Sequence, residues 1–262
     1  MITSTATAGV AIAFLGISAA SAADLAARPN VKAPVYYPTA SWTGCYIGGN
    51  VGGAWTHFNS AGVAFAGVPF PSIDFGGQNG NSVIGGGQIG CDYQFASNWV
   101  VGIQGQGDFG TTRSSNAVAA FPGITAQFAS RNIETLTGRV GYAVAPTVLA
   151  YVKGGAAWAG ATGAALLPGG SIAESADFTM TGYVVGAGLE WMFARGWSVF
   201  GEYNYMDFGT KNVDFVSTGT GGVAFGPAGA LSDTVAIRLT AQTALVGVNY
   251  KFNFGGQVSR TE

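Results

Sequence analysis

The chain has 262 residues, of which 9% are charged, against about 25% in ordinary soluble domains. Glycine accounts for 43 of the 262 residues, more than twice its usual share of about 7%. So little charge cannot cover a water-facing surface, and the net charge of −2 argues against nucleic acid as a partner. No run of about 18 apolar residues follows the N-terminus to form a membrane-spanning helix. Together with 13% aromatic residues, these facts favour strands that alternate between lipid and an enclosed interior.

The N-terminus has the pattern of an export signal. Residues 8–20 form a short apolar run, and Ala20-Ser21-Ala22 follows as a small-x-small cleavage site. The run is too short to span a bilayer, so we predict a signal peptide over 1–22, although no Lys or Arg precedes it. A buried N-terminal helix is the alternative. Residues 23–41 contain three prolines and are predicted to be a periplasmic N-terminal tail.

From residue 42 onward the sequence alternates with a period of two. Near 42–55, for example, Ile47 and Trp55 share one face, whereas Tyr46 and Asn50 share the other. The first face suits lipid and the second suits a crowded polar lumen. Eight segments show this pattern, near 42–55, 82–95, 99–109, 132–143, 147–158, 180–193, 197–207 and 243–252.

The connections between these segments alternate in length. Three turns of about three residues are expected at Ala96-Ser97-Asn98, Val144-Ala145-Pro146 and Ala194-Arg195-Gly196. Four connections, near 57–81, 110–131, 159–179 and 208–235, are expected to be loops of more than about 20 residues. Short periplasmic turns and long outer loops are typical of outer-membrane barrels. We therefore predict an all-β protein: an eight-stranded antiparallel transmembrane β-barrel over 42–254, in the Gram-negative outer membrane, with a periplasmic tail over 255–262.

Four charged residues fall at positions that face the lumen, namely Arg139, Lys153, Glu190 and Glu202. An eight-stranded barrel is only wide enough for side chains to fill it. Charges there lose water and need partners, and two cations can balance two anions. We predict that this lumen charge cluster forms a polar plug. A ring of charges that lines a conduit is the alternative.

The two cysteines, Cys45 and Cys91, face outward on neighbouring antiparallel strands. Export favours oxidation, and directly opposed strand residues lie within disulfide range. The pattern leaves two possibilities open, a cross-strand disulfide or two thiols that only pack against each other.

No pattern indicates catalysis, a cofactor or a metal. Gly85-Gly86-Gly87-Gln88-Ile89-Gly90 formally matches a dinucleotide-binding motif, but it lies inside a predicted strand instead of before a helix. His57 is the only histidine, and the spacing of Ser60 and Asp74 beside it is not diagnostic of a triad. No His/Cys cluster exists to hold a metal. We therefore expect that the protein is not an enzyme.

Two expected loops are rich in phenylalanine. Residues 58–75 contain Phe58, Phe65, Phe70 and Phe75, and residues 213–225 contain Phe215 and Phe225. Such segments can pack on one another, cap the lumen, or bind an apolar ligand or a host surface. Mutual packing is the simplest expectation.

With these residues laid out, the chain resembles the small alphaproteobacterial outer-membrane β-barrels called outer-membrane immunogenic or porin-family proteins, which are similar to the transmembrane part of OmpA. The resemblance covers about 42–254 and departs from many relatives at Cys45 and Cys91, which often are aromatic there, and in the extension beyond Phe252. The segments that carry it are Trp42-Thr43-Gly44-Cys45-Tyr46-Ile47-Gly48-Gly49-Asn50, Gly85-Gly86-Gly87-Gln88-Ile89-Gly90 with Tyr93-Gln94-Phe95, Gly138-Arg139-Val140-Gly141-Tyr142, and Val248-Asn249-Tyr250-Lys251-Phe252.

The resemblance implies a surface antigen that supports envelope integrity. It also implies an assembly signal in the last strand, at Tyr250 and Phe252, which the barrel-assembly machinery would read. Outer-membrane lipid and lipopolysaccharide are the other expected partners, and an extracellular ligand is not identified. A small-solute porin and a surface that binds a host or apolar ligand are the alternative functions.

Overall fold

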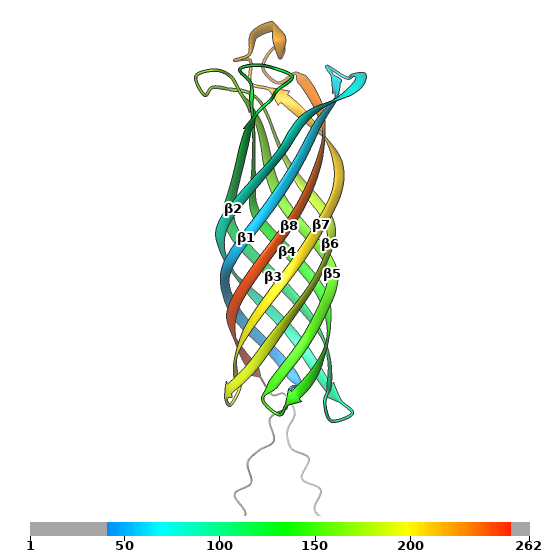
Figure 1. The fold of residues 1–262 in the computed structure, drawn as a ribbon, viewed down its shortest axis with the longest axis vertical. Helices are drawn as coiled ribbons and strands as arrows, with labels where there is room; N and C mark the ends of the chain where they lie inside the picture. The colour runs from blue at the N-terminus through cyan, green and yellow to red at the C-terminus, as the bar shows by residue number, and fades with distance from the viewer. Residues whose placement is uncertain (1–40, 253–262) are drawn as a thin grey trace, which may run out of the picture. The chain divides into compact units, whose positions relative to one another are not determined.

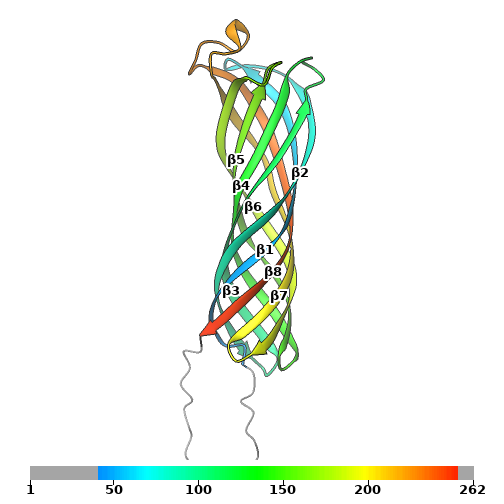
Figure 2. The same ribbon diagram turned by 90° about the vertical axis from the view of Figure 1, so that its left-hand side faces the viewer.

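The computed structural model describes residues 41–252, which form one closed barrel of eight antiparallel strands (Figures 1 and 2). The predicted signal peptide over 1–22, nearly all of the tail over 23–41, and the tail over 255–262 lie outside the described residues. The strands are β1 (Gly44–Phe65), β2 (Val68–Phe95), β3 (Trp99–Ala117), β4 (Thr125–Ala145), β5 (Val148–Leu166), β6 (Ile172–Ala194), β7 (Trp197–Ser217) and β8 (Leu231–Phe252), with a 3₁₀ turn η1 (Gly222–Ala224) before β8.

The barrel closes between its first and last strands. Each strand pairs with its neighbours in sequence, and β1 pairs with both β2 and β8, so that Ile47 lies opposite Ile89 on one side and Tyr250 on the other. Closure leaves no unpaired strand edge, which is what a sheet in lipid requires. The predicted eight-stranded barrel is confirmed. No helix among residues 41–252 is long and apolar enough to cross a membrane.

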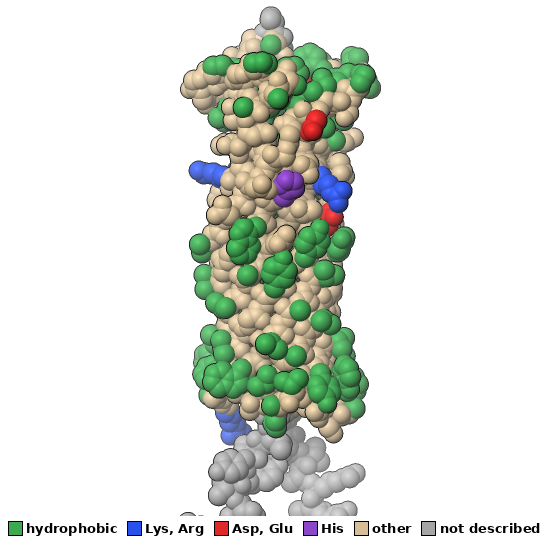
Figure 3. All heavy atoms as spheres, in the orientation of Figure 1, with side chains coloured by type: hydrophobic (Ala, Val, Ile, Leu, Met, Phe, Trp, Pro, Cys, Tyr) green, Lys and Arg blue, Asp and Glu red, His purple; other side chains and the backbone are tan. Residues whose placement is uncertain are grey.

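Below the loop end, hydrophobic side chains gather in two bands, here called belts, across the face of the barrel drawn in Figure 3. The first lies at the end with the short turns, here called the turn end, where Trp99 packs on Tyr142 and Trp197 packs on Tyr250. The second lies midway along the strands (Figure 3), and Phe109 is an exposed side chain near the middle of β3. The stretch of β3 from Trp99 to Phe109 matches the about 9–11 residues that a tilted strand needs to cross a bilayer. The belts therefore mark the two surfaces of the membrane.

The prediction of four long loops, near 57–81, 110–131, 159–179 and 208–235, is wrong. The strands continue well beyond the second belt, and the connections at this loop end shrink to 66–67, 118–124, 167–171 and 218–230. The period of two persists there, but the apolar side chains now face inward and the polar ones face outward. Phe58, for example, points inward, while His57 and Asn59 point outward. Outside the membrane the exterior meets water, so the apolar face of each strand turns to the interior.

The barrel interior is accordingly divided into two layers. Toward the turn end it is filled by polar and charged side chains, with a small apolar cluster that includes Trp42, Val100 and Leu149 at the very end, and toward the loop end by a large apolar cluster. In this cluster the rings of Phe58 and Phe128 stack at 5.3 Å between centroids. The other large members are Ile133, Met180, Met206, Phe208, Phe215, Ile237 and Leu239.

Candidate functional site

The most distinctive chemistry of the described residues lies inside the barrel, where Arg139 of β4 joins two carboxylates. Its Nε donates to Asp92 Oδ1 at 2.8 Å, and one terminal nitrogen donates to Glu190 Oε2 at 3.2 Å. Asp92 lies on β2 and Glu190 on β6, each two strands away from β4. The guanidinium group therefore ties together strands that do not pair with each other.

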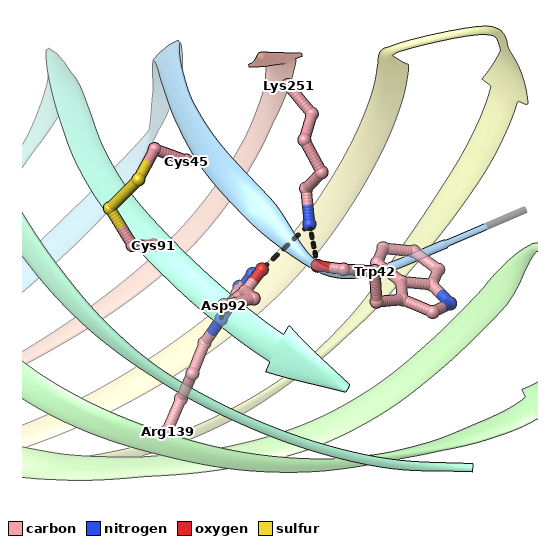
Figure 4. Close-up of a disulfide and its surroundings, with 6 residues drawn as sticks. All are labelled: Trp42, Cys45, Cys91, Asp92, Arg139 and Lys251. Carbon is pink, nitrogen blue, oxygen red and sulfur yellow. Dashed lines mark hydrogen bonds and ion pairs between the residues drawn. A yellow bond between two sulfur atoms is a disulfide. The ribbon is translucent and has the colours of Figure 1, made fainter. Parts of the chain in front are cut away.

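A second cation shares one of these carboxylates (Figure 4). Lys251 Nζ of β8 lies 2.8 Å from Asp92 Oδ2 and donates to the Trp42 carbonyl oxygen at 2.7 Å. The Trp42 carbonyl belongs to the segment that enters β1, so this contact ties the start of the first strand to the end of the last strand. All three side chains of the Arg139–Asp92–Lys251 group are nearly completely buried.

A further ion pair lies deeper along the lumen. Lys153 Nζ of β5 is 2.6 Å from Glu202 Oε1 of β7 and 3.2 Å from Gln106 Oε1. Glu202 also accepts hydrogen bonds from Tyr151 at 2.8 Å and from Asn204 at 2.9 Å. These contacts replace the water that the charges lose, which is the condition for ions to persist in an interior.

Aromatic rings fill the space around the cations. The Arg139 guanidinium lies 4.8 Å from the ring centroid of Tyr46 and 5.0 Å from that of Tyr151, and Lys251 lies 5.1 Å from the Trp42 ring. Cation–π attraction is stronger when the cation is desolvated. The rings thus both occupy volume and stabilise charge.

Neutral groups extend the network from one strand to the next. Gln88 donates to Asn249, which donates to Glu190, and Ser198 donates to the same Glu190 oxygen. A second chain leads from Gln104 through Gln106 to Asp108. A network of this extent holds the lumen side chains in one arrangement.

The structure brings together the four predicted lumen charges, Arg139, Lys153, Glu190 and Glu202, as two ion pairs. The sequence reasoning left out three further buried charges of the same layer, Asp92, Asp108 and Lys251, so that the layer contains three cations and four carboxylates. The period of two puts all three at inward-facing positions of their strands, and this pattern is the signal that could have identified them.

The glycines of the Gly85–Gly90 segment lie inside β2, and lumen side chains crowd two of them, Gly86 and Gly90. A Cβ added to Gly90 would lie 2.5 Å from the Tyr46 hydroxyl oxygen and 2.7 Å from the Ile103 carbonyl oxygen. Only glycine leaves room for the Tyr46 ring beneath Arg139. Gly86 and Gly90 therefore serve packing within the barrel.

Cys45 of β1 and Cys91 of β2 are directly opposed and joined by a disulfide on the outer surface (Figure 4). The bond lies near the turn end, one residue from Asp92.

The structure does not gather His57, Ser60 and Asp74 into a triad. His57 is exposed, with its Nδ1 at 2.6 Å from Asn79 Oδ1, whereas Ser60 faces the interior. Within residues 41–252, no group of three or more His, Cys, Asp or Glu side chains could hold a metal.

The remaining predicted residues lie at the two ends of the barrel. Tyr250 and Phe252 sit in the belt at the turn end, with their rings 4.9 Å apart. Of the phenylalanines expected in loops, Phe58 and Phe215 lie instead in the apolar interior. Phe75 packs on Phe121 at the loop end, with centroids 6.0 Å apart.

Comparison with known proteins places this architecture. Residues 10–252 match the family model of the outer membrane protein beta-barrel domain. The 31 kDa outer-membrane immunogenic protein of Brucella melitensis is 27% identical over 257 residues, which cover 92% of this chain and 97% of that protein. A Coxiella burnetii protein is 30% identical over 240 residues, 84% of this chain and 88% of that one. Among solved structures, OprG of Pseudomonas aeruginosa aligns over 82% of this chain and 98% of its own, with 13% identity and a TM-score of 0.49.

Proposed function

The chain belongs to the outer membrane protein beta-barrel domain family and resides in the Gram-negative outer membrane, and from this premise we propose that it is a closed structural barrel and surface antigen of the cell envelope. In this function it crosses the membrane, ties its strands together internally and exposes its loop end to the medium. Its lumen conducts no solute.

The observation that carries the proposal is the filled interior. Arg139, Asp92 and Glu190 connect β4 with β2 and β6 through buried contacts of 2.5–3.2 Å. Above this polar layer the apolar cluster closes the same lumen a second time, with Phe58 stacked on Phe128. Water and ions would have to pass both layers. Breaking one buried ion pair alone costs about 3–5 kcal/mol, so the closed arrangement is strongly preferred.

The alternatives have less support. A small-solute porin needs a water-filled lumen, which barrels of this strand number lack. An enzyme needs convergent side chains, and the exposed His57 and the inward Ser60 diverge. We further propose that the aromatic belts contact membrane lipid and lipopolysaccharide, and that the barrel-assembly machinery reads Tyr250 and Phe252 at the end of β8.

Planar-bilayer recording of the purified protein tests this function. We expect no stable conductance from the wild type under conditions in which a general porin, reconstituted in the same way, gives clear steps. The Arg139→Ala variant should also remain silent, because the apolar layer still closes the lumen. Reproducible channels from the wild type would refute the closed barrel, and a stable channel from Arg139→Ala alone would refute the second closure.

The role in the envelope is tested in cells. Deletion of the gene should sensitise the bacteria to detergent, and both the wild type and the Asp177→Asn variant, whose change lies on the exposed outer face of β6, should restore resistance. Intact cells should bind antibodies raised against the loop-end segment 218–230. Deletion cells that resist detergent as well as the parent would contradict the structural role.

A further inference from the structure

The loop end of the barrel holds a cavity that the closed lumen does not use. It has a volume of about 430 Å³ and opens above the apolar cluster. Phenylalanines from several strands and connections line it, namely Phe65, Phe75, Phe121, Phe128, Phe215 and Phe225. This size falls in the range of small-molecule sites, about 300–1,000 Å³. The apolar walls favour a ligand with an aromatic or aliphatic body.

Two carboxylates interrupt this apolar lining. Glu174 of β6 and Asp233 of β8 both line the cavity, and no Lys, Arg or His is among the described residues around it. Glu174 is only 4% exposed, and among residues 41–252 its Oε2 has no hydrogen-bond partner. A buried carboxylate oxygen without a partner is costly, so this oxygen is a site that awaits a donor.

The neighbouring strands bring no cation to this negative charge, and the groups that favour the ionised form of Glu174 are the Ser232 hydroxyl and the backbone N–H of Asp233. Glu174 lies opposite Ala165 of β5 and Ser217 of β7, and Asp233 lies opposite Phe65 of β1. Burial and the nearby Asp233 carboxylate raise the pKa of Glu174 from 4.5 to about 7, and burial raises the pKa of Asp233 as well. The two acids thus resist ionising together unless a cation enters between them.

We propose that this cavity is a binding site for a small amphipathic cation, an ammonium group on an aromatic or alkyl body. The ammonium would donate to Glu174 and Asp233, and the body would pack among the phenylalanines. The apolar body of the ligand matches the apolar walls of the cavity, and its ammonium group supplies the donor that the carboxylate oxygen of Glu174 lacks. The sequence allowed these phenylalanines to bind an apolar ligand, and the proposal adds a positive charge to that ligand. The site does not depend on whether the lumen below it conducts solutes.

Three probes with one aromatic ring and different head groups test the proposal: phenethylamine, phenethyl alcohol and phenylacetate. Each is titrated by calorimetry into the protein in nanodiscs at slightly alkaline pH, and the signal from empty nanodiscs is subtracted. Because hydrogen bonds to charged groups are the stronger ones, we expect the amine to bind at least about tenfold more tightly than the alcohol, and the carboxylate to bind most weakly.

The variants assign this preference to the two acids. Glu174→Gln combined with Asp233→Asn should weaken the amine about tenfold, to the level of the alcohol, while alcohol binding stays unchanged and reports an intact cavity. Asp177→Asn is the matched control, because Asp177 lies on the same strand with its side chain 78% exposed. It should leave all three affinities unchanged.

Several results would overturn the proposal. They are equal affinities for the three probes, no amine binding beyond that of empty nanodiscs, or an amine affinity that survives the double substitution. A loss of binding in Asp177→Asn equal to that in the double variant would show general surface charge instead of a site. Channel recordings on the same preparation report separately on lumen closure, so failure of one proposal is distinguishable from failure of the other.

Discussion

Replacing Arg139 by alanine tests whether the buried network holds the barrel together. The substitution removes the partner of Glu190 at 3.2 Å and the nearer partners of Asp92 at 2.5–2.8 Å, while Lys251 still contacts Asp92. Because Glu190 is left buried without a cation, we expect a loss of about 3–5 kcal/mol in the free energy of unfolding. The double variant Arg139→Ala with Glu190→Gln should recover part of this loss, because it no longer buries the unpaired charge of Glu190, and a double-mutant cycle measures the coupling between the two residues.

The same strand offers a matched control. Arg131 also lies on β4, but it pairs with Asp177 at 3.8 Å and both side chains are more than half exposed. Exposed pairs contribute about 0–1 kcal/mol, so Arg131→Ala should leave stability almost unchanged. Urea unfolding in lipid vesicles, followed by tryptophan fluorescence and by heat-dependent gel migration, measures both variants. Equal losses in Arg131→Ala and Arg139→Ala would refute the reasoning that burial gives the ion pair its weight.

Three further predictions concern other parts of the barrel. Cys45→Ser with Cys91→Ser should lower stability by about 2–4 kcal/mol under oxidising conditions only, and the unreduced, unfolded wild type should show no thiol that reacts with a maleimide; a reactive thiol there would contradict the disulfide. Phe252→Ala should reduce the membrane fraction that folds, whereas Phe193→Ala, which removes a similarly exposed ring from β6, should not; equal folding of both variants would exclude a special role for the last strand. Burial and the Asp233 carboxylate raise the pKa of Glu174 to about 7, so the folded state keeps a proton that the unfolded chain releases, and stability should fall as pH rises from about 4.5 to about 7; Glu174→Gln should flatten the unfolding curve in this window, and an unchanged slope would show that another group titrates.

Much of the barrel follows from local patterns in the sequence. The period of two assigns each residue to one face, and it placed Arg139 and Lys153 inward and Ile47 and Trp55 outward, as the structure has them. This works within the membrane because lipid demands one polarity from every outward side chain.

The same rule misread the part of the barrel outside the membrane. The rule expects apolar residues on the outer face, so it predicts a loop around Phe58, although buried and exposed side chains continue to alternate there. The position of the membrane surface along the strands decides where the outward face changes from lipid to water, and a short stretch of sequence does not contain this information.

What the sequence by itself determined is the class of fold and the face on which each residue of the membrane segments lies, because both depend on neighbours along one strand. The tertiary structure alone decided which charges meet: Arg139 selects Asp92 and Glu190, 47 and 51 positions away, although Glu202 also points into the lumen. It also decided that Glu174 and Asp233 share one cavity. Such pairings depend on the closure of the barrel, which sets the stagger of all eight strands at once and which the chain settles only when β8 joins β1.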